Sequence, residues 1–213
     1  MSVIQYLAIA AVCYCFVAMF AHLLKVVRLG APKDLSEPSG SVKDGVVYSN
    51  TRAMMPDQKE SAYLHLPSYA VGMLFHIGIF CSLLLFILSF FPFFNNWIQS
   101  CAWSLILAVP SVIGGVCGVI LFVRRLLSKD LKVFSTPDDF ISVSFVAFFQ
   151  IMTALYLIFL GSSAINTIYY VSSILLFLYM PFGKLRHAVY YFAARFHLGF
   201  FYGWRNVWPN KEK

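Results

Sequence analysis

The chain has 213 residues, of which 60% are hydrophobic and only 12% are charged, and its formal net charge is +7. So few charged side chains cannot give a soluble domain of this size a wettable surface, which excludes an ordinary soluble enzyme and favours a lipid bilayer as the solvent. The positive charge does not indicate nucleic-acid binding, because no nucleic-acid-binding motif accompanies it. Contact with anionic membrane lipid explains it better.

Five stretches are apolar over the roughly 20 residues that a helix needs to cross a hydrocarbon core about 30 Å thick. They cover residues 3–24, 69–91, 102–123, 140–160 and 166–187. All nine acidic and all sixteen basic residues fall in 25–60, 124–139 and 184–213, which are alternate connections, and basic connections tend to stay in the cytoplasm. The sequence predicts one all-α domain over residues 1–213, a five-transmembrane-helix bundle in the cell (cytoplasmic) membrane. We expect the amino terminus outside and the carboxy terminus in the cytoplasm.

Residues 25–68 form the long polar stretch of the chain and are the predicted cytoplasmic loop, while residues 188–213 are the predicted cytoplasmic tail. A loop of this length is either a disordered linker or a surface that becomes ordered against a partner. Its mixed charges and its apolar side chains, such as Tyr48 and Met54, favour the second interpretation. The loop and the tail are therefore the expected docking surface for a partner.

Two local patterns predict how helices begin and pack. Thr136-Pro137-Asp138-Asp139 offers an N-cap residue, a proline for the first turn and acidic groups at the positive end of a helix dipole. Gly114 and Gly118 form a small-xxx-small pattern, which allows two helix backbones to approach closely.

The five cysteines lie at the apolar positions 13, 15, 81, 101 and 117, and no two form a C-x-x-C pair. We therefore expect buried thiols, with no disulfide framework and no iron–sulfur or zinc site held by this chain. If electrons pass through iron–sulfur clusters, a partner protein must therefore hold those clusters.

The five histidines, at positions 22, 65, 76, 187 and 197, all fall toward the predicted cytoplasmic side. His76 lies about seven residues into the second span, hence about 10 Å deep, and His187 ends the fifth span at a similar level. An imidazole in hydrocarbon needs a partner, and two of them can hold the iron of one haem between them. In the alternative interpretation, His76 donates a hydrogen bond to a neighbouring helix and His187 merely ends a span.

The neighbours of these two histidines suit a porphyrin. Gly72 and Gly78 remove bulk on either side of His76, and Lys184 and Arg186 are close enough in sequence to His187 to pair with haem propionates. His22, which has small residues along its own helical face, is a reserve ligand for the iron. His65 and His197 are expected at or beyond the interface and are not predicted ligands.

Residues 73–80 (MLFHIGIF) and 181–187 (PFGKLRH) resemble the two haem-bearing stretches of the cytochrome b subunit, the gamma subunit, of respiratory nitrate reductase. Similar membrane subunits occur in heterodisulfide reductases and in sulfite-reduction complexes. The resemblance covers most of the chain and extends to five spans, an outside amino terminus and ligands on the second and fifth helices. It implies that quinol is oxidised in the membrane and that electrons pass through b-type haem to a cytoplasmic iron–sulfur partner.

The chain departs from this family at the second haem. The family pattern places a further histidine pair on the second and fifth helices, where this sequence has Phe86 and Tyr169. Gly183 also replaces the hydroxyl residue that is usual in the second stretch. The resemblance therefore implies one haem b, the one nearer the cytoplasm, with aromatic side chains filling the outer site.

The sequence thus predicts a haem b membrane anchor, a redox subunit without a catalytic residue of its own. It would exchange electrons between menaquinone or ubiquinone and a cytoplasmic iron–sulfur or flavoprotein partner of a respiratory complex. We expect the quinone within reach of the single haem, with Gln150 and Thr153 as candidate contacts, although hydrogen bonding between helices is the commoner use of such residues. The rival prediction is a cofactor-free membrane anchor or scaffold. A transporter is disfavoured, because the predicted midplane carries few polar groups.

Overall fold

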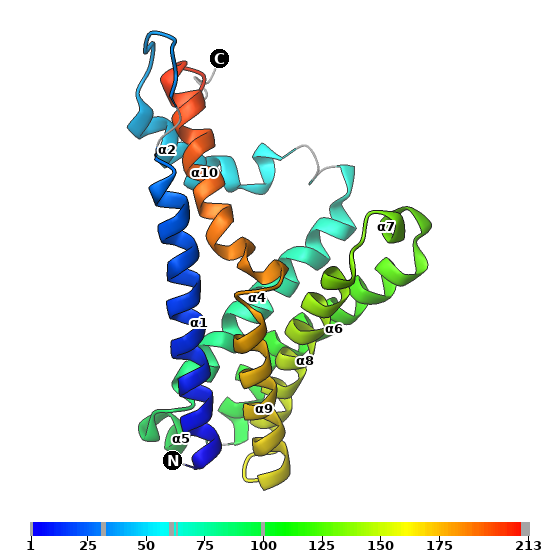
Figure 1. The fold of residues 1–213 in the computed structure, drawn as a ribbon. Helices are drawn as coiled ribbons and strands as arrows, with labels where there is room; N and C mark the ends of the chain where they lie inside the picture. The colour runs from blue at the N-terminus through cyan, green and yellow to red at the C-terminus, as the bar shows by residue number, and fades with distance from the viewer. Residues whose placement is uncertain (1, 31–32, 60–61, 63, 99–100, 210–213) are drawn as a thin grey trace. The chain divides into compact units, whose positions relative to one another are not determined.

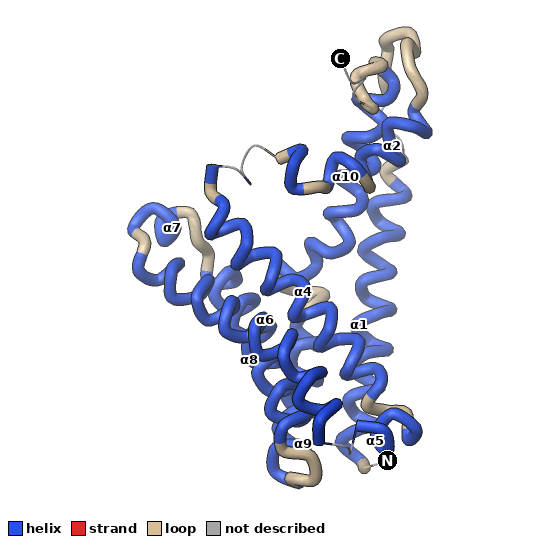
Figure 2. Tube along the Cα trace, turned by 180° about the vertical axis from the view of Figure 1, so that it is seen from behind, coloured by secondary structure: helices blue, strands red, loops and turns tan. Residues whose placement is uncertain are grey.

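The computed structural model describes the whole chain except residues 1, 31–32, 60–61, 63, 99–100 and 210–213. Every regular element in the described part is helical (Figure 2). The α-helices are α1 Val3–Arg28, α2 Val42–Asn50, α4 Leu66–Leu88, α5 Pro92–Ile98, α6 Cys101–Leu127, α7 Lys129–Val133, α8 Pro137–Ile158, α9 Ser163–Tyr179 and α10 His187–Trp204. Three short 3₁₀ helices are η1 Arg52–Met54, η2 Pro56–Gln58 and η3 Lys184–Arg186.

Four helices are long and apolar enough to cross a membrane: α1, α4, α6 from residue 102 onward, and α8. A fifth span is counted only if α9 and the segment Lys184–Trp204 are taken together as one broken span. The prediction of an all-helical membrane protein is confirmed at this level, with four to five spans, whereas the sidedness of the termini stays a prediction.

The prediction of one continuous fifth helix over residues 166–187 is wrong. α9 ends at Tyr179, a turn follows, and His187 begins α10 instead of ending a span. Pro181 stands in this turn. Proline lacks the amide proton that would continue the helix and its ring clashes with the preceding turn, so the break falls where the sequence places the proline.

The chain divides into two compact units, and unit 1 contains residues 1–16 and 67–185. Within it, α8 packs against α6 on one side and α9 on the other. Gly114 of α6 allows the closest approach, because a Cβ atom there would lie 2.7 Å from the Cα of Gly78 on α4. Gly118 lies against Ala147 of α8, so the predicted small-residue contact is confirmed.

The first turn of α8 is anchored by Asp139. Its carboxylate accepts hydrogen bonds from the amide nitrogen of Thr136 (2.8 Å) and from the Thr136 hydroxyl (2.9 Å), which confirms the predicted N-terminal cap. The same carboxylate forms ion pairs with Arg125 of α6 (2.7 Å) and with Lys184 after α9 (2.6 Å). One acidic side chain therefore joins the ends of three consecutive long helices.

Unit 2 contains residues 17–66 and 186–213 and is built on the packing of α2 along α10 (Figure 1). Gly45 of α2 lies against the backbones of Gly199 and Gly203 of α10. The hydroxyl of Ser49 donates to the carbonyl of Arg195 (2.7 Å), whose guanidinium in turn donates to the carbonyl of Ser49. The α2 segment of the predicted cytoplasmic loop is thus ordered against the tail of its own chain, and docking of a partner on the loop stays a prediction.

The thiols are less uniformly enclosed than predicted. Cys15 and Cys117 are buried and Cys81 is half-buried, but Cys13 is exposed on α1. The side chain of Cys101 lies outside the described residues. An apolar helix that faces lipid can expose a thiol without cost, so membership of a span did not imply burial in the bundle.

Candidate functional site

His76 lies on the exposed side of α4, whereas its neighbours Phe75 and Gly78 face the interior of unit 1. Its Nδ1 atom is 2.7 Å from the carbonyl oxygen of Gly72. Because a carbonyl can only accept, Nδ1 carries the proton and Nε2 keeps its lone pair. Metal-binding histidines commonly donate their second ring N–H to a carbonyl in this way, which fixes the tautomer and the orientation of the ring.

The surface beside His76 is open on the side of Gly72. A Cβ atom built at Gly72 would meet no other atom within 4 Å, so the exposed imidazole has free space one helical turn away, as a porphyrin face requires. The same expectation for Gly78 is wrong. A Cβ atom there would collide with Gly114 and Gln150, because Gly78 serves the packing of α4 on α6 and α8.

His187 belongs to unit 2, where it is the exposed first residue of α10 and follows the exposed Arg186. His22 lies in the same unit, half-buried on α1, with its Nδ1 atom 3.2 Å from the hydroxyl of Tyr190 on α10. The His22 ring is therefore already within hydrogen-bonding distance of Tyr190. His76 and His187 lie in different units, so their pairing across one iron stays a prediction.

The two basic residues proposed for the propionates differ in their surroundings. The Lys184 ammonium is paired with Asp139, which is 9% exposed, so binding a propionate would compete with this contact. Arg186 is exposed on η3. Of the two, Arg186 is the better candidate.

Phe86 and Tyr169 contact each other in the interior of unit 1. Their ring centroids lie 6.1 Å apart, and the two side chains are 1% and 0% exposed. Tyr169 also stacks on Tyr156, with centroids 4.6 Å apart and planes inclined by 13°, and Phe86 packs against Phe149 and Phe177. Aromatic rings in direct contact leave no room for a porphyrin between positions 86 and 169.

Gln150 and Thr153, the candidate quinone contacts, are both fully buried. The Thr153 hydroxyl donates to the carbonyl of Phe149 in its own helix (2.8 Å), so it does not join two helices. The Gln150 amide projects between Gly78 and Gly114, and neither its oxygen nor its nitrogen has a hydrogen-bond partner among the described residues. A quinone ring could reach these side chains only if the helices separated.

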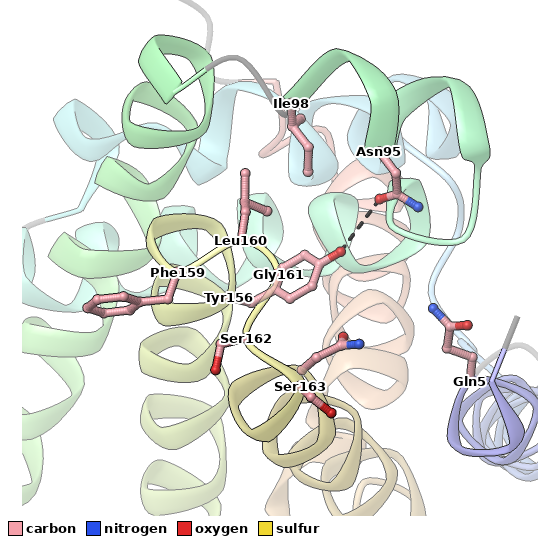
Figure 3. A pocket seen from close by; sticks show the side chains of 10 residues that line it. Gln5, Asn95, Ile98, Tyr156, Phe159, Leu160, Gly161, Ser162 and Ser163 are labelled. Atoms are coloured by element: carbon pink, nitrogen blue, oxygen red, sulfur yellow. Dashed lines mark hydrogen bonds between the residues drawn. The ribbon is translucent and has the colours of Figure 1, made fainter.

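A cavity of about 660 Å³ lies at the α8–α9 turn of unit 1 (Figure 3). Its walls mix amides and hydroxyls with apolar side chains: Gln5, Asn95, Ile98, Tyr156, Phe159, Leu160, Gly161, Ser162, Ser163 and Asn166. The sequence analysis missed this cavity. Its polar residues come from four separate helices, and no spacing within one segment could have revealed it.

Comparisons of the chain with protein-family models, with curated protein sequences and with solved structures find no match. The resemblance to cytochrome b subunits, which rests on the two histidine-bearing stretches and on the order of the apolar spans, therefore stays a prediction.

Proposed function

We propose that the chain is a haem b membrane anchor subunit that exchanges electrons between the quinone pool and a cytoplasmic iron–sulfur or flavoprotein partner. The observation that carries this proposal is the setting of His76. Its Nδ1–H donates to the Gly72 carbonyl at 2.7 Å, and open space adjoins it at Gly72. A fixed ring orientation and an open adjoining surface both support binding of a flat cofactor at this histidine.

In this proposal, His76 and His187 are the residues that would hold the iron of one haem. The haem, when bound, takes up and releases one electron at a time. The Gly72 carbonyl orients the His76 ring and increases the basicity of Nε2. Arg186 offers a positive charge next to His187 for a propionate. In this proposal, the reaction on the terminal substrate belongs to the partner.

The packing of Phe86 on Tyr169 supports the proposal of a single haem. Where the resembling family has a second ligand pair, unit 1 has an aromatic interior whose rings are in contact. Electrons would therefore enter and leave through the haem nearer the cytoplasm. The quinone, menaquinone or ubiquinone, would bind within reach of that haem and outside the closed core around Gln150.

The test is a reduced-minus-oxidised absorbance spectrum with haem quantitation on the purified protein, its His76→Ala and His187→Ala variants and a His197→Ala control. We expect one low-spin b haem per chain in the parent and the control, and none in the two ligand variants. A haem-free parent would overturn the proposal. It would favour the cofactor-free anchor, which the mutual packing of loop and tail in unit 2 also suits.

A further inference from the structure

Polar side chains form a row along the interior of unit 1. Tyr156, Thr153 and Gln150 follow one another on α8 at three-residue spacing, which places them on adjacent turns of one face and extends the row about 9 Å along the helix. Thr153 and Gln150 are 0% exposed.

The row begins at the cavity beside the α8–α9 turn. The Tyr156 hydroxyl lines this cavity and lies 3.5 Å from the side-chain oxygen of Asn95 (Figure 3). Beside it, the Tyr170 hydroxyl accepts a hydrogen bond from the Gln5 amide (3.0 Å) and lies 3.2 Å from the hydroxyl of Ser89. The cavity thus leads into a cluster of hydroxyls within the bundle.

This end of the bundle carries side chains typical of the interface between membrane and water. Trp97 and Trp103 stack nearby with ring centroids 5.4 Å apart, and each is 48% exposed. Exposed tryptophans are typical of the interface between membrane and water. The cavity next to them, lined by Asn95 and Ile98 of the same short helix, therefore opens at the depth of the lipid headgroups.

The middle of the row continues through enclosed hydroxyls. Tyr169, which is 0% exposed, has its hydroxyl beside those of Thr153 and Ser89, but forms no hydrogen bond of ordinary geometry with either. Ser82 of α4 and Ser111 of α6 form a buried pair with their oxygens 2.9 Å apart. Each hydroxyl can accept one proton on a lone pair while it releases its own.

The row ends at Gln150, at a level of the bundle close to that of His76. Its amide oxygen lies against Gly78, which is two residues from His76 on α4, and both polar atoms of the amide lack partners among the described residues. A buried amide without hydrogen bonds costs on the order of a few kcal/mol. Internal water is the usual means by which proteins satisfy such groups.

We propose that these side chains form a hydrated proton pathway from the cavity at the α8–α9 turn to Gln150. This proposal deepens the proposed function and rests on it for its purpose. Oxidation of a quinol to a quinone releases two electrons and two protons. The electrons pass to the redox partner. Because the quinol lies outside the closed core, its protons pass through internal water to Gln150 and then leave along the row to the side of the membrane on which the α8–α9 turn lies.

The first test measures whether a water-sized cation reaches the row. The five native cysteines are replaced by alanine, and Thr153→Cys, Gln150→Cys and Ala154→Cys are each treated with silver ions in the folded state. Ala154 is the matched control, because it is 3% exposed on the same helix but lies in the apolar cluster with Leu85 and Leu157. Thiols that remain unreacted are then counted after unfolding.

We expect silver to react at positions 150 and 153 at least tenfold faster than at 154, in variants that keep the parent melting temperature. Equal rates at all three positions, whether slow or fast, would overturn the pathway. The same silver reaction is carried out on the cysteine variants with and without His76→Ala. Because hydration of the row needs no haem, the result distinguishes failure of the pathway from failure of haem binding.

The second test follows proton movement itself. The hydroxyl of Tyr169 is exchanged for deuterium in heavy water and identified in infrared spectra by the band that Tyr169→Phe removes. Along a hydrated row, this buried proton exchanges within seconds. Exchange that is as slow as that of the buried backbone amides of α8 would show a dry interior and overturn the proposal.

Discussion

The rings of Phe86 on α4 and Tyr169 on α9 lie 6.1 Å apart and are shielded almost completely from the surroundings. Within a membrane, helices are held together by close packing more than by expulsion of water, so a filled contact of this kind carries much of the stability of the bundle. The same contact leaves no room for a porphyrin between positions 86 and 169.

Phe86→Ala should therefore destabilise the protein by about 3 kcal/mol, because it leaves a ring-sized cavity among Phe149, Tyr169 and Phe177. Thermal unfolding in detergent measures the change. Phe80→Ala on the same helix is the control, since its ring is 67% exposed and its removal leaves no cavity. Equal melting temperatures for the two variants would contradict the assigned packing.

Gly72→Leu should separate haem binding from folding. A Cβ atom at position 72 meets no atom within 4 Å, so the variant should unfold at the same temperature as the parent. The leucine would occupy the surface next to His76, and haem content should fall to less than a fifth. Gly78→Leu should instead destabilise the fold itself, because that position lies against the backbone of Gly114.

Asp139→Asn should weaken the end of unit 1 at which α8 begins. The substitution removes the charge that pairs with Arg125 and Lys184 and leaves the partly buried Arg125 without an anion. Breaking a largely buried ion pair on one side costs about 3 kcal/mol. Chemical denaturation compared with the exposed Asp130→Asn measures the effect, and a loss below about 1 kcal/mol would show that the network contributes little.

Unit 2 should lose stability in acid through Asp34. The hydroxyl and the amide of Ser36, together with Arg205, hold the pKa of Asp34 below its ordinary value. A lowered folded-state pKa means that the stabilisation is complete above the unfolded-state pKa, about 3.9, and is lost as the pH falls through the lower folded-state value. Fluorescence of Trp204, whose indole donates to the Ser36 carbonyl, reports the change.

The control for the acid transition is Asp34→Asn, which should abolish this part of the pH dependence. Trp97 and Trp103 of unit 1 are replaced by phenylalanine so that the signal comes from unit 2. An unchanged acid transition in Asp34→Asn would assign it to another carboxylate.

The sequence by itself determined the membrane class of the protein and the positions of its long helices. The predicted starts and ends of the first four spans agree with α1, α4, α6 and α8 to within a few residues, because apolar length is a local property that the bilayer imposes on each segment separately. The cap at Thr136 and the small-residue contact at Gly114 were predictable for the same reason. Each of these two features depends on residues that lie within one or two helical turns of each other in the sequence.

Only the tertiary structure decided which side chains meet. In the structure, α9 and α10 are separate helices on either side of Pro181, and Lys184 pairs with Asp139. Helix α2 of the polar loop packs against α10 of the tail. The tertiary structure also enclosed Gln150 and Thr153 and brought polar groups of four helices to one cavity. These outcomes depend on contacts between residues far apart in sequence, where the direction of each side chain is set by packing and not by the local pattern.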